Sequence, residues 1–68
     1  MSFERTRRAI AERQVESGQR LIEKQRGLIA DKKARGLDAG ASEQLLASFE
    51  RSQAVFQEEL AAIDADQT

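Results

Sequence analysis

The residue types that carry most enzyme and metal chemistry are missing from this chain. Its 68 residues include no cysteine and no histidine. A thiolate zinc site, a Cys–His nucleophile pair and an imidazole general base are therefore excluded. A di-iron bundle of the usual kind is excluded too, because it needs Glu-x-x-His on two helices. The four glycines are scattered, so there is no glycine-rich phosphate loop. We expect a non-enzymatic protein with no cofactor.

Carboxylate pairs are the remaining candidates for acid–base chemistry or for binding a hard metal ion. Glu58 and Glu59 are adjacent, and Glu12 and Glu16 lie four residues apart. Adjacent side chains on a helix point about 100° apart, and no apolar pocket is expected around them to tune them for proton transfer. We interpret both pairs as solvated and predict no metal site.

The densest basic cluster, Arg5-Thr6-Arg7-Arg8, is the candidate for contact with an anionic partner, together with Phe3. Arginine binds phosphate bidentately, so a nucleic-acid-associated accessory function that uses Arg5, Arg7, Arg8 and Arg13 is the alternative hypothesis. Against it stand an acidic isoelectric point, the absence of a helix-turn-helix pattern and the lack of aromatic residues other than three phenylalanines. We therefore expect no nucleic-acid partner.

The candidate residues lie within two segments of the sequence that each have an amphipathic pattern, and both patterns predict helices. From residue 3 to 35 there is no proline, and strong helix formers dominate. Steps of three and four residues define a heptad seam. Its members are Val15, Gly18, Ile22, Gln25 and Ile29. Beside it lie Ala11, Gln14, Leu21 and Leu28, which widen the stripe as in a helix that contacts two neighbours. Gly27 could break this helix, but the seam keeps its phase from Ile22 to Ile29.

The second pattern predicts a helix over about 39–64, followed by a short frayed C-terminus. Residues at seven-residue spacing line one side of it. They are Ser42, Phe49, Phe56 and Ile63, with Leu46, Gln53 and Leu60 on the same face and Leu45 next to them. The turn between the helices spans 36–38. Gly36 suits the left-handed C′ position, followed by Leu37 in a Schellman-type cap, and Asp38 suits the N-cap.

So short a connection makes the helices antiparallel neighbours, and we predict an all-α helical hairpin that forms a single domain over residues 1–68. Counting outward from the turn pairs Ile29 with Leu46, Ile22 with Gln53 and Val15 with Leu60. On that register the first eight or so residues extend past the end of the second helix, and the basic cluster lies on this overhang.

The charge of −1 divides unevenly between the two helices. Residues 1–36 hold ten basic and five acidic side chains, a net +5, whereas residues 37–68 hold one basic and seven acidic side chains, a net −6. This asymmetry indicates either a charged partner or charge pairing within the fold. We favour pairing between the antiparallel helices.

Two features near the stripes have more than one interpretation. Gln14, Gln25 and Gln53 could be buried amides that fix the register, or rim residues that face water. Gly18 is unfavourable in a helix interior by about 1 kcal/mol relative to alanine. Either the facing helix approaches it closely, under Phe56, or the site leaves a gap large enough for a ligand.

Only sixteen large apolar side chains are present, too few for a comfortable single-chain core. Two helices also leave a wide apolar stripe in water. We expect a homodimer that closes a four-helix bundle and acts as a protein–protein interaction module, an adaptor, regulatory subunit or assembly component. A hairpin that folds fully only within a larger complex is a further possibility. No apolar run approaches the roughly 20 residues of a membrane span, and we expect a cytoplasmic protein.

The chain resembles a family of short, uncharacterised bacterial proteins that consist of one helical hairpin. The likeness covers residues 14–60. It lies in Val15-x-x-Gly18-x-x-x-Ile22-x-x-Gln25-Arg26-x-x-Ile29-Ala30, in Gly36-x-Asp38 and in Leu45-Leu46-Ala47-x-Phe49-Glu50. Family members often have histidine where this chain has Gln14 and Phe56, so any role of those imidazoles is absent here. The resemblance implies the hairpin and no known activity.

Overall fold

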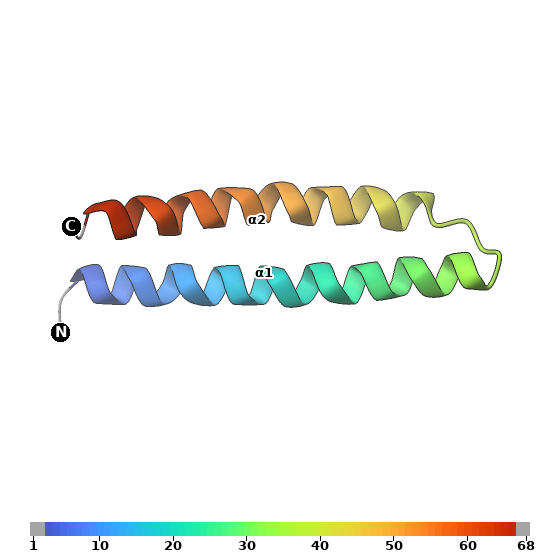
Figure 1. The fold of residues 1–68 in the computed structure, drawn as a ribbon, viewed down its shortest axis with the longest axis horizontal. Helices are drawn as coiled ribbons and strands as arrows, with labels where there is room; N and C mark the ends of the chain where they lie inside the picture. The colour runs from blue at the N-terminus through green and yellow to red at the C-terminus, as the bar shows by residue number, and fades with distance from the viewer. Residues whose placement is uncertain (1–2, 67–68) are drawn as a thin grey trace.

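Two long antiparallel helices make up the structure, a computed structural model that describes residues 3–66 and the side chains of residues 5–66. Helix α1 spans Phe3–Ala34 and helix α2 spans Gly40–Asp66. They lie side by side, so that α1 begins where α2 ends (Figure 1). The hairpin measures 51 × 17 × 14 Å. The predicted all-α helical hairpin is thus confirmed, with bounds close to the expected 3–35 and 39–64.

The end of α1 is a Schellman motif centred on Gly36. Gly36 has a φ of 70°, in the left-handed region that a glycine adopts at low cost. Leu37 N–H donates to the Lys32 carbonyl at 2.8 Å, and Gly36 N–H donates to the Lys33 carbonyl at 3.1 Å. These two bonds satisfy carbonyls that have no partner within the helix.

Asp38 satisfies one backbone N–H at the start of α2. Its Oδ1 accepts a hydrogen bond from Gly40 N–H at 2.9 Å. Asp38 is not the N-cap that the sequence predicted, however, because the N-cap is the residue whose carbonyl accepts the first helical bond, and that residue is Ala39. The first helical bond runs from Glu43 N–H to the Ala39 carbonyl, so α2 begins at Gly40. Lys32 and Lys33 in the last turn of α1 and Glu43 in the first turn of α2 are both placed favourably for the helix dipoles.

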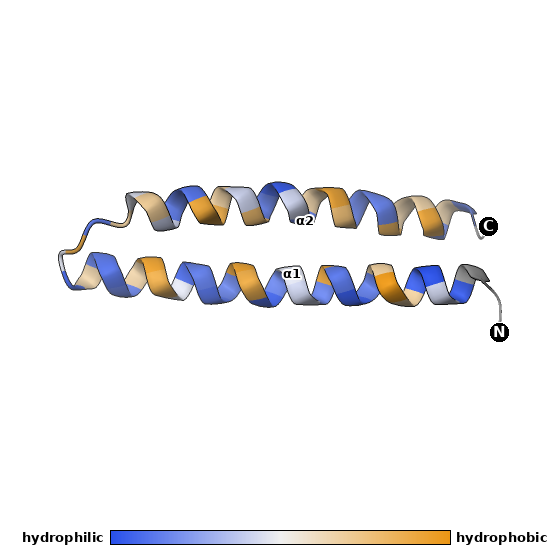
Figure 2. Ribbon diagram, turned by 180° about the vertical axis from the view of Figure 1, so that it is seen from behind, coloured by the Kyte–Doolittle hydropathy of each residue, from blue (hydrophilic) through white to orange (hydrophobic). Residues whose placement is uncertain are grey.

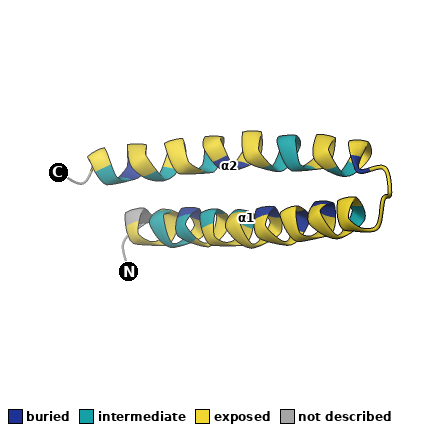
Figure 3. Cartoon of the chain, turned by 45° about the vertical axis from the view of Figure 1, so that its right-hand side comes forward, coloured by how far each residue is buried: buried dark blue, intermediate teal, exposed yellow. Residues whose placement is uncertain are grey.

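The core is one narrow seam between the helices. Dark blue buried segments of α1 lie on the side toward α2 (Figure 3). The buried residues are Ala11, Ile22, Ile29, Ala39 and Ile63, with the polar Gln25 and Gln53. Other predicted seam residues are half-buried, namely Val15, Gly18, Leu46, Phe49, Phe56 and Leu60. Ala39 was not predicted, because it lies in the connection rather than in either apolar stripe.

The predicted register and overhang are wrong. Gln53 lies against Val15 and Gly18, about one turn closer to the start of α1 than the expected Ile22. The five-residue connection and the glutamine contacts shift α2 along α1, and α2 continues to Asp66. As a result Arg8 lies beside Asp64, and the basic cluster does not project beyond the hairpin as a free end.

Candidate interaction surface

The two sides of the hairpin differ in the polarity of their side chains. We call one side the polar face and the other the apolar face, and we define each by its residues. The polar face carries three ion pairs between the helices. They are Lys33–Glu43 at 3.1 Å, Arg26–Glu50 at 3.4 Å and Arg8–Asp64. Glu43 and Glu50 are seven residues apart, as are Arg26 and Lys33, so these pairs recur on one side at every second turn. The acidic α2 and the basic α1 therefore neutralise each other along this face.

The apolar face lies on the other side of the hairpin. Arg26 and Lys33 follow Leu21 and Leu28 by five residues each, which places the two sets about 140° apart around α1. Residues of both helices form the apolar face. They are Ile10, Leu21 and Leu28 of α1 with Leu45, Phe49 and Phe56 of α2. Orange bands recur along both ribbons (Figure 2).

The apolar face is open to solvent in the single chain. Ile10 and Leu21 are each 49% exposed, Leu28 is 47% exposed and Leu45 is 45% exposed. Leu21, Leu28 and Leu45 were expected to lie in a core or an interface, and they do not belong to the core of the hairpin. Single exposed leucines are common on protein surfaces, whereas a row of them along one side of a small protein makes that side the candidate for an interaction surface.

A groove crosses the apolar face near Gly18. Its volume is about 480 Å³, and it is a wide surface depression rather than an enclosed cavity. Seven residues line it, Ile10, Arg13, Gln14, Ser17, Gly18, Leu21 and Phe56. Gln14 is exposed here. Two small residues, Ser17 and Gly18, lie among larger side chains in this lining. This shape suits a protruding apolar side chain of a partner.

Two buried glutamines tie the helices together beneath this face. Gln53 Nε2 donates to the Val15 carbonyl at 2.8 Å, and Gln25 Nε2 donates to the Ser42 carbonyl at 2.9 Å. Both side chains are buried. A methyl group added to Gly18 would overlap the Gln53 amide. The close approach expected at Gly18 is therefore made by Gln53 rather than by Phe56, and these two amides hold the register.

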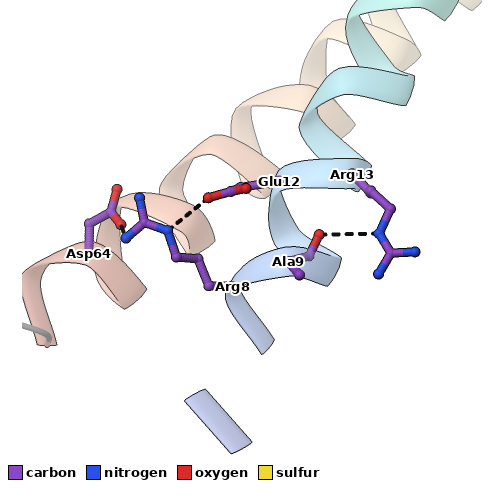
Figure 4. A network of polar contacts seen from close by, with 5 residues as sticks. All are labelled: Arg8, Ala9, Glu12, Arg13 and Asp64. Carbon is purple, nitrogen blue, oxygen red and sulfur yellow. Dashed lines mark hydrogen bonds and ion pairs between the residues drawn. The ribbon is translucent and has the colours of Figure 1, made fainter. Parts of the chain in front are cut away.

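At the open end of the hairpin, Arg8 connects the two helices. Its Nε donates to Glu12 Oε1 at 2.7 Å, and its Nη1 pairs with Asp64 Oδ1 (Figure 4). The hydrogen bond to Glu12, and then the charge of Asp64, raise the pKa of Arg8 above its usual value. A guanidinium is already fully charged at neutral pH, so these contacts anchor a permanent cation on the polar face.

The other candidate partner-contact residues are less informative. Arg5 and Arg7 are exposed, and the side chain of Phe3 lies outside the described residues. Lys32, which was not predicted as a cross-helix contact, donates from Nζ to Ser42 Oγ at 2.6 Å. The predicted pairing already placed Lys32 opposite Glu43, next to Ser42, but Ser42 was interpreted only as a member of the heptad pattern.

The part of the chain that the structure describes contains no group of three acidic side chains that could hold a metal ion. Neither described helix has an apolar stretch that could cross a bilayer. The molecule is an antiparallel helical hairpin with one apolar and one ion-paired face. Comparison with protein-family models, with curated proteins and with solved structures gives no match to this chain.

Proposed function

We propose that the protein is a homodimeric helical module for protein–protein interaction. Two hairpins bury their apolar faces against each other in a four-helix bundle and present the remaining helical surfaces to other proteins. The role assigned to the chain is that of an adaptor, a regulatory subunit or an assembly component, without chemistry of its own. The observation that carries the proposal is the contiguous exposed apolar face on both helices.

The dimensions of the hairpin support this proposal. Its accessible surface is 5134 Å², whereas a compact monomer of the same mass exposes about 4,300 Å². A side 51 Å long and 17 Å wide has an area of about 870 Å², close to the area of about 800 Å² that each partner contributes to a standard interface. The side of the hairpin that carries the apolar face is therefore large enough for a stable, specific association.

The nucleic-acid alternative draws less support. Arg8, Arg26 and Lys33 are paired with carboxylates of α2, so α1 offers less free positive charge than its sequence suggests. A phosphate-binding surface would show affinity for duplex DNA or RNA that falls steeply with salt. Electrophoretic or fluorescence titration at about 50 mM salt tests this, and we expect no binding.

Sedimentation equilibrium of the purified chain tests the proposal. We expect a mass of twice 7.6 kDa and a melting temperature that rises with concentration, because association stabilises only the folded state. A mass of one chain, with a melting temperature independent of concentration, would overturn it. A chain that stays disordered at every concentration would also overturn it, in favour of a subunit that folds on a larger partner.

A further inference from the structure

The cross-helix contacts define which residues lie at the same level along the hairpin. Arg8 lies beside Asp64, and Gly18 lies beside Gln53. Arg13 is midway between Arg8 and Gly18, and Glu59 is about midway between Gln53 and Asp64. Arg13 and Glu59 are therefore level with each other, on opposite helices. Phe56 is level with the groove, since it forms one wall of it.

Two identical hairpins can stack their apolar faces in two symmetric ways. A two-fold axis parallel to the helices places α1 over the partner's α2, with both turns at the same end. A two-fold axis across the helices places α1 over the partner's α1, with the turns at opposite ends. Both arrangements are closed isologous dimers, so the residues along the edges must decide between them.

Charge at the edge of the apolar face distinguishes the two arrangements. Along α1 this edge carries Arg13, Arg20 and Lys24, with the acidic Asp31 nearer the turn, all exposed. Along α2 the corresponding edge carries Ser48, Ser52 and the exposed Glu59. With the turns at opposite ends, the two basic edges lie against each other. With the turns at the same end, each basic edge lies against a neutral or acidic one, and Arg13 is level with the partner's Glu59, where the opposite charges attract.

The position of the groove also favours the arrangement with both turns at the same end. With the turns at the same end, α2 of the second copy crosses α1 at an unchanged level, and its Phe56 is therefore placed over Ser17 and Gly18. A large ring then enters a depression whose lining includes the small residues Ser17 and Gly18, and large and small side chains alternate within one layer of the bundle. The groove needs no occupant other than a second copy of this chain.

We infer that the dimer has both turns at one end, with Phe56 of each copy in the groove of the other and with Arg13 paired to Glu59 across the interface. This inference rests on the proposed function, since it specifies the partner and its orientation on the apolar face. It assigns an intermolecular role to Arg13, whose guanidinium contacts the Ala9 carbonyl of its own helix at 3.5 Å (Figure 4).

Electron–electron distance measurements test the orientation. The chain has no cysteine, so Ala34→Cys introduces a single spin label, at an exposed site next to the turn. Turns at one end place the two labels within about 30 Å, because packed helices lie about 8–10 Å apart. Turns at opposite ends place them roughly 40 Å apart, since Ala34 lies about 14 residues beyond the middle of the hairpin.

A charge exchange provides a second, independent readout. Arg13→Glu and Glu59→Arg should each weaken dimerisation about three- to tenfold, because an exposed pair is modest in energy but occurs twice in a symmetric dimer. The double variant should return to within about twofold of the original chain. Arg26→Glu, which breaks an ion pair on the polar face, is the matched control, and we expect it to leave the dimerisation constant unchanged.

The outcomes separate this inference from the proposed function. A short label distance together with rescue by the double variant supports the orientation. A distance of roughly 40 Å, or a double variant weaker than both single variants, overturns the orientation while the homodimer stands. Labels that show no intermolecular distance, in a sample with the mass of one chain, overturn both.

Discussion

The polar face and the apolar face of this hairpin share the same heptad spacing but differ in what their side chains contact. On the polar face, Lys33–Glu43 and Arg26–Glu50 link the helices while their side chains stay 48–63% exposed. Exposed ion pairs contribute little to stability, and these two place opposite charges of α1 and α2 beside each other. On the apolar face, Leu21, Leu28 and Leu45 have no comparable partner in the hairpin. One face therefore links the two helices of a single chain, and the other is the face that we propose for association between chains.

The largest expected effect comes from placing a charge on the apolar face. Leu21→Asp should raise the dimer dissociation constant at least 100-fold, about 2.7 kcal/mol, because an unpaired carboxylate would be buried in the interface. Val55→Asp is the matched control, since Val55 is 59% exposed and points about 100° away from Phe56. Sedimentation equilibrium measures both. Equal dimerisation of the two variants would show that the apolar face is not the interface.

The next largest effect is expected in the buried seam between the two helices, which separates the polar face from the apolar face. Gly18→Ala should destabilise the protein by about 1 kcal/mol, because the new methyl group displaces the Gln53 amide and breaks its bond to Val15. In a Gln53→Ala background the same substitution should instead stabilise by up to about 1 kcal/mol, from helix propensity alone. Thermal or urea unfolding at fixed concentration measures the cycle.

Gly27→Ala is the control for that cycle. Nothing lies within 4 Å of a methyl group at position 27, so this substitution should stabilise by about 0.5–1 kcal/mol in either background. If Gly18→Ala also stabilised the original chain, the contact with Gln53 would carry no weight in the register, and the account of the seam would be wrong.

The turn should show an effect of similar size for a different reason. Gly36→Ala should cost about 1 kcal/mol, because alanine adopts the observed φ of 70° unfavourably, while Gly36→Asn should cost less. Chemical unfolding of the three chains ranks them. Since Gly36 is far from the apolar face, a change in the dimer dissociation constant larger than the change in folding stability would contradict the separation of the two regions.

The smallest effect is expected on the polar face. Glu50→Gln removes the carboxylate that pairs with Arg26 and should cost only a few tenths of a kcal/mol, a loss that shrinks further as salt increases. Arg8 is charged throughout the neutral range, as every guanidinium is. Its pKa is raised in the folded protein, so its stabilising contribution is present at neutral pH and is lost only in strong alkali. Unfolding at low and high ionic strength tests the salt dependence.

The sequence predicted the elements better than their alignment. Uninterrupted heptads, Gly36 and Asp38 specify two helices and a turn through local physics alone, namely backbone sterics and capping bonds. The register depends on contacts between distant residues, and counting outward from the turn ignored them. Gln53 can reach Val15 only because Gly18 has no side chain, and that pairing cannot be deduced from spacing.

The candidate surface could be predicted only in part, because it too depends on contacts between the two helices. The stripe of Leu21, Leu28 and Leu45 is visible in the sequence, but which of its members face the other helix depends on how each helix is rotated. Rotation follows from where the buried amides of Gln25 and Gln53 find carbonyl acceptors. The predicted overhang of the basic cluster was wrong because α2 continues to Asp66 and its last turns lie level with Arg8.

Isotope-filtered nuclear Overhauser spectroscopy tests the central claim most directly, that a second copy closes the apolar face. A sample mixed from labelled and unlabelled chains reports contacts between chains alone. We predict intermolecular signals from the methyl groups of Leu21 and Leu28 to the rings of Phe49 and Phe56, and none from Val55. Absence of signals from these leucines, or intermolecular contacts centred on Val55, would contradict the account.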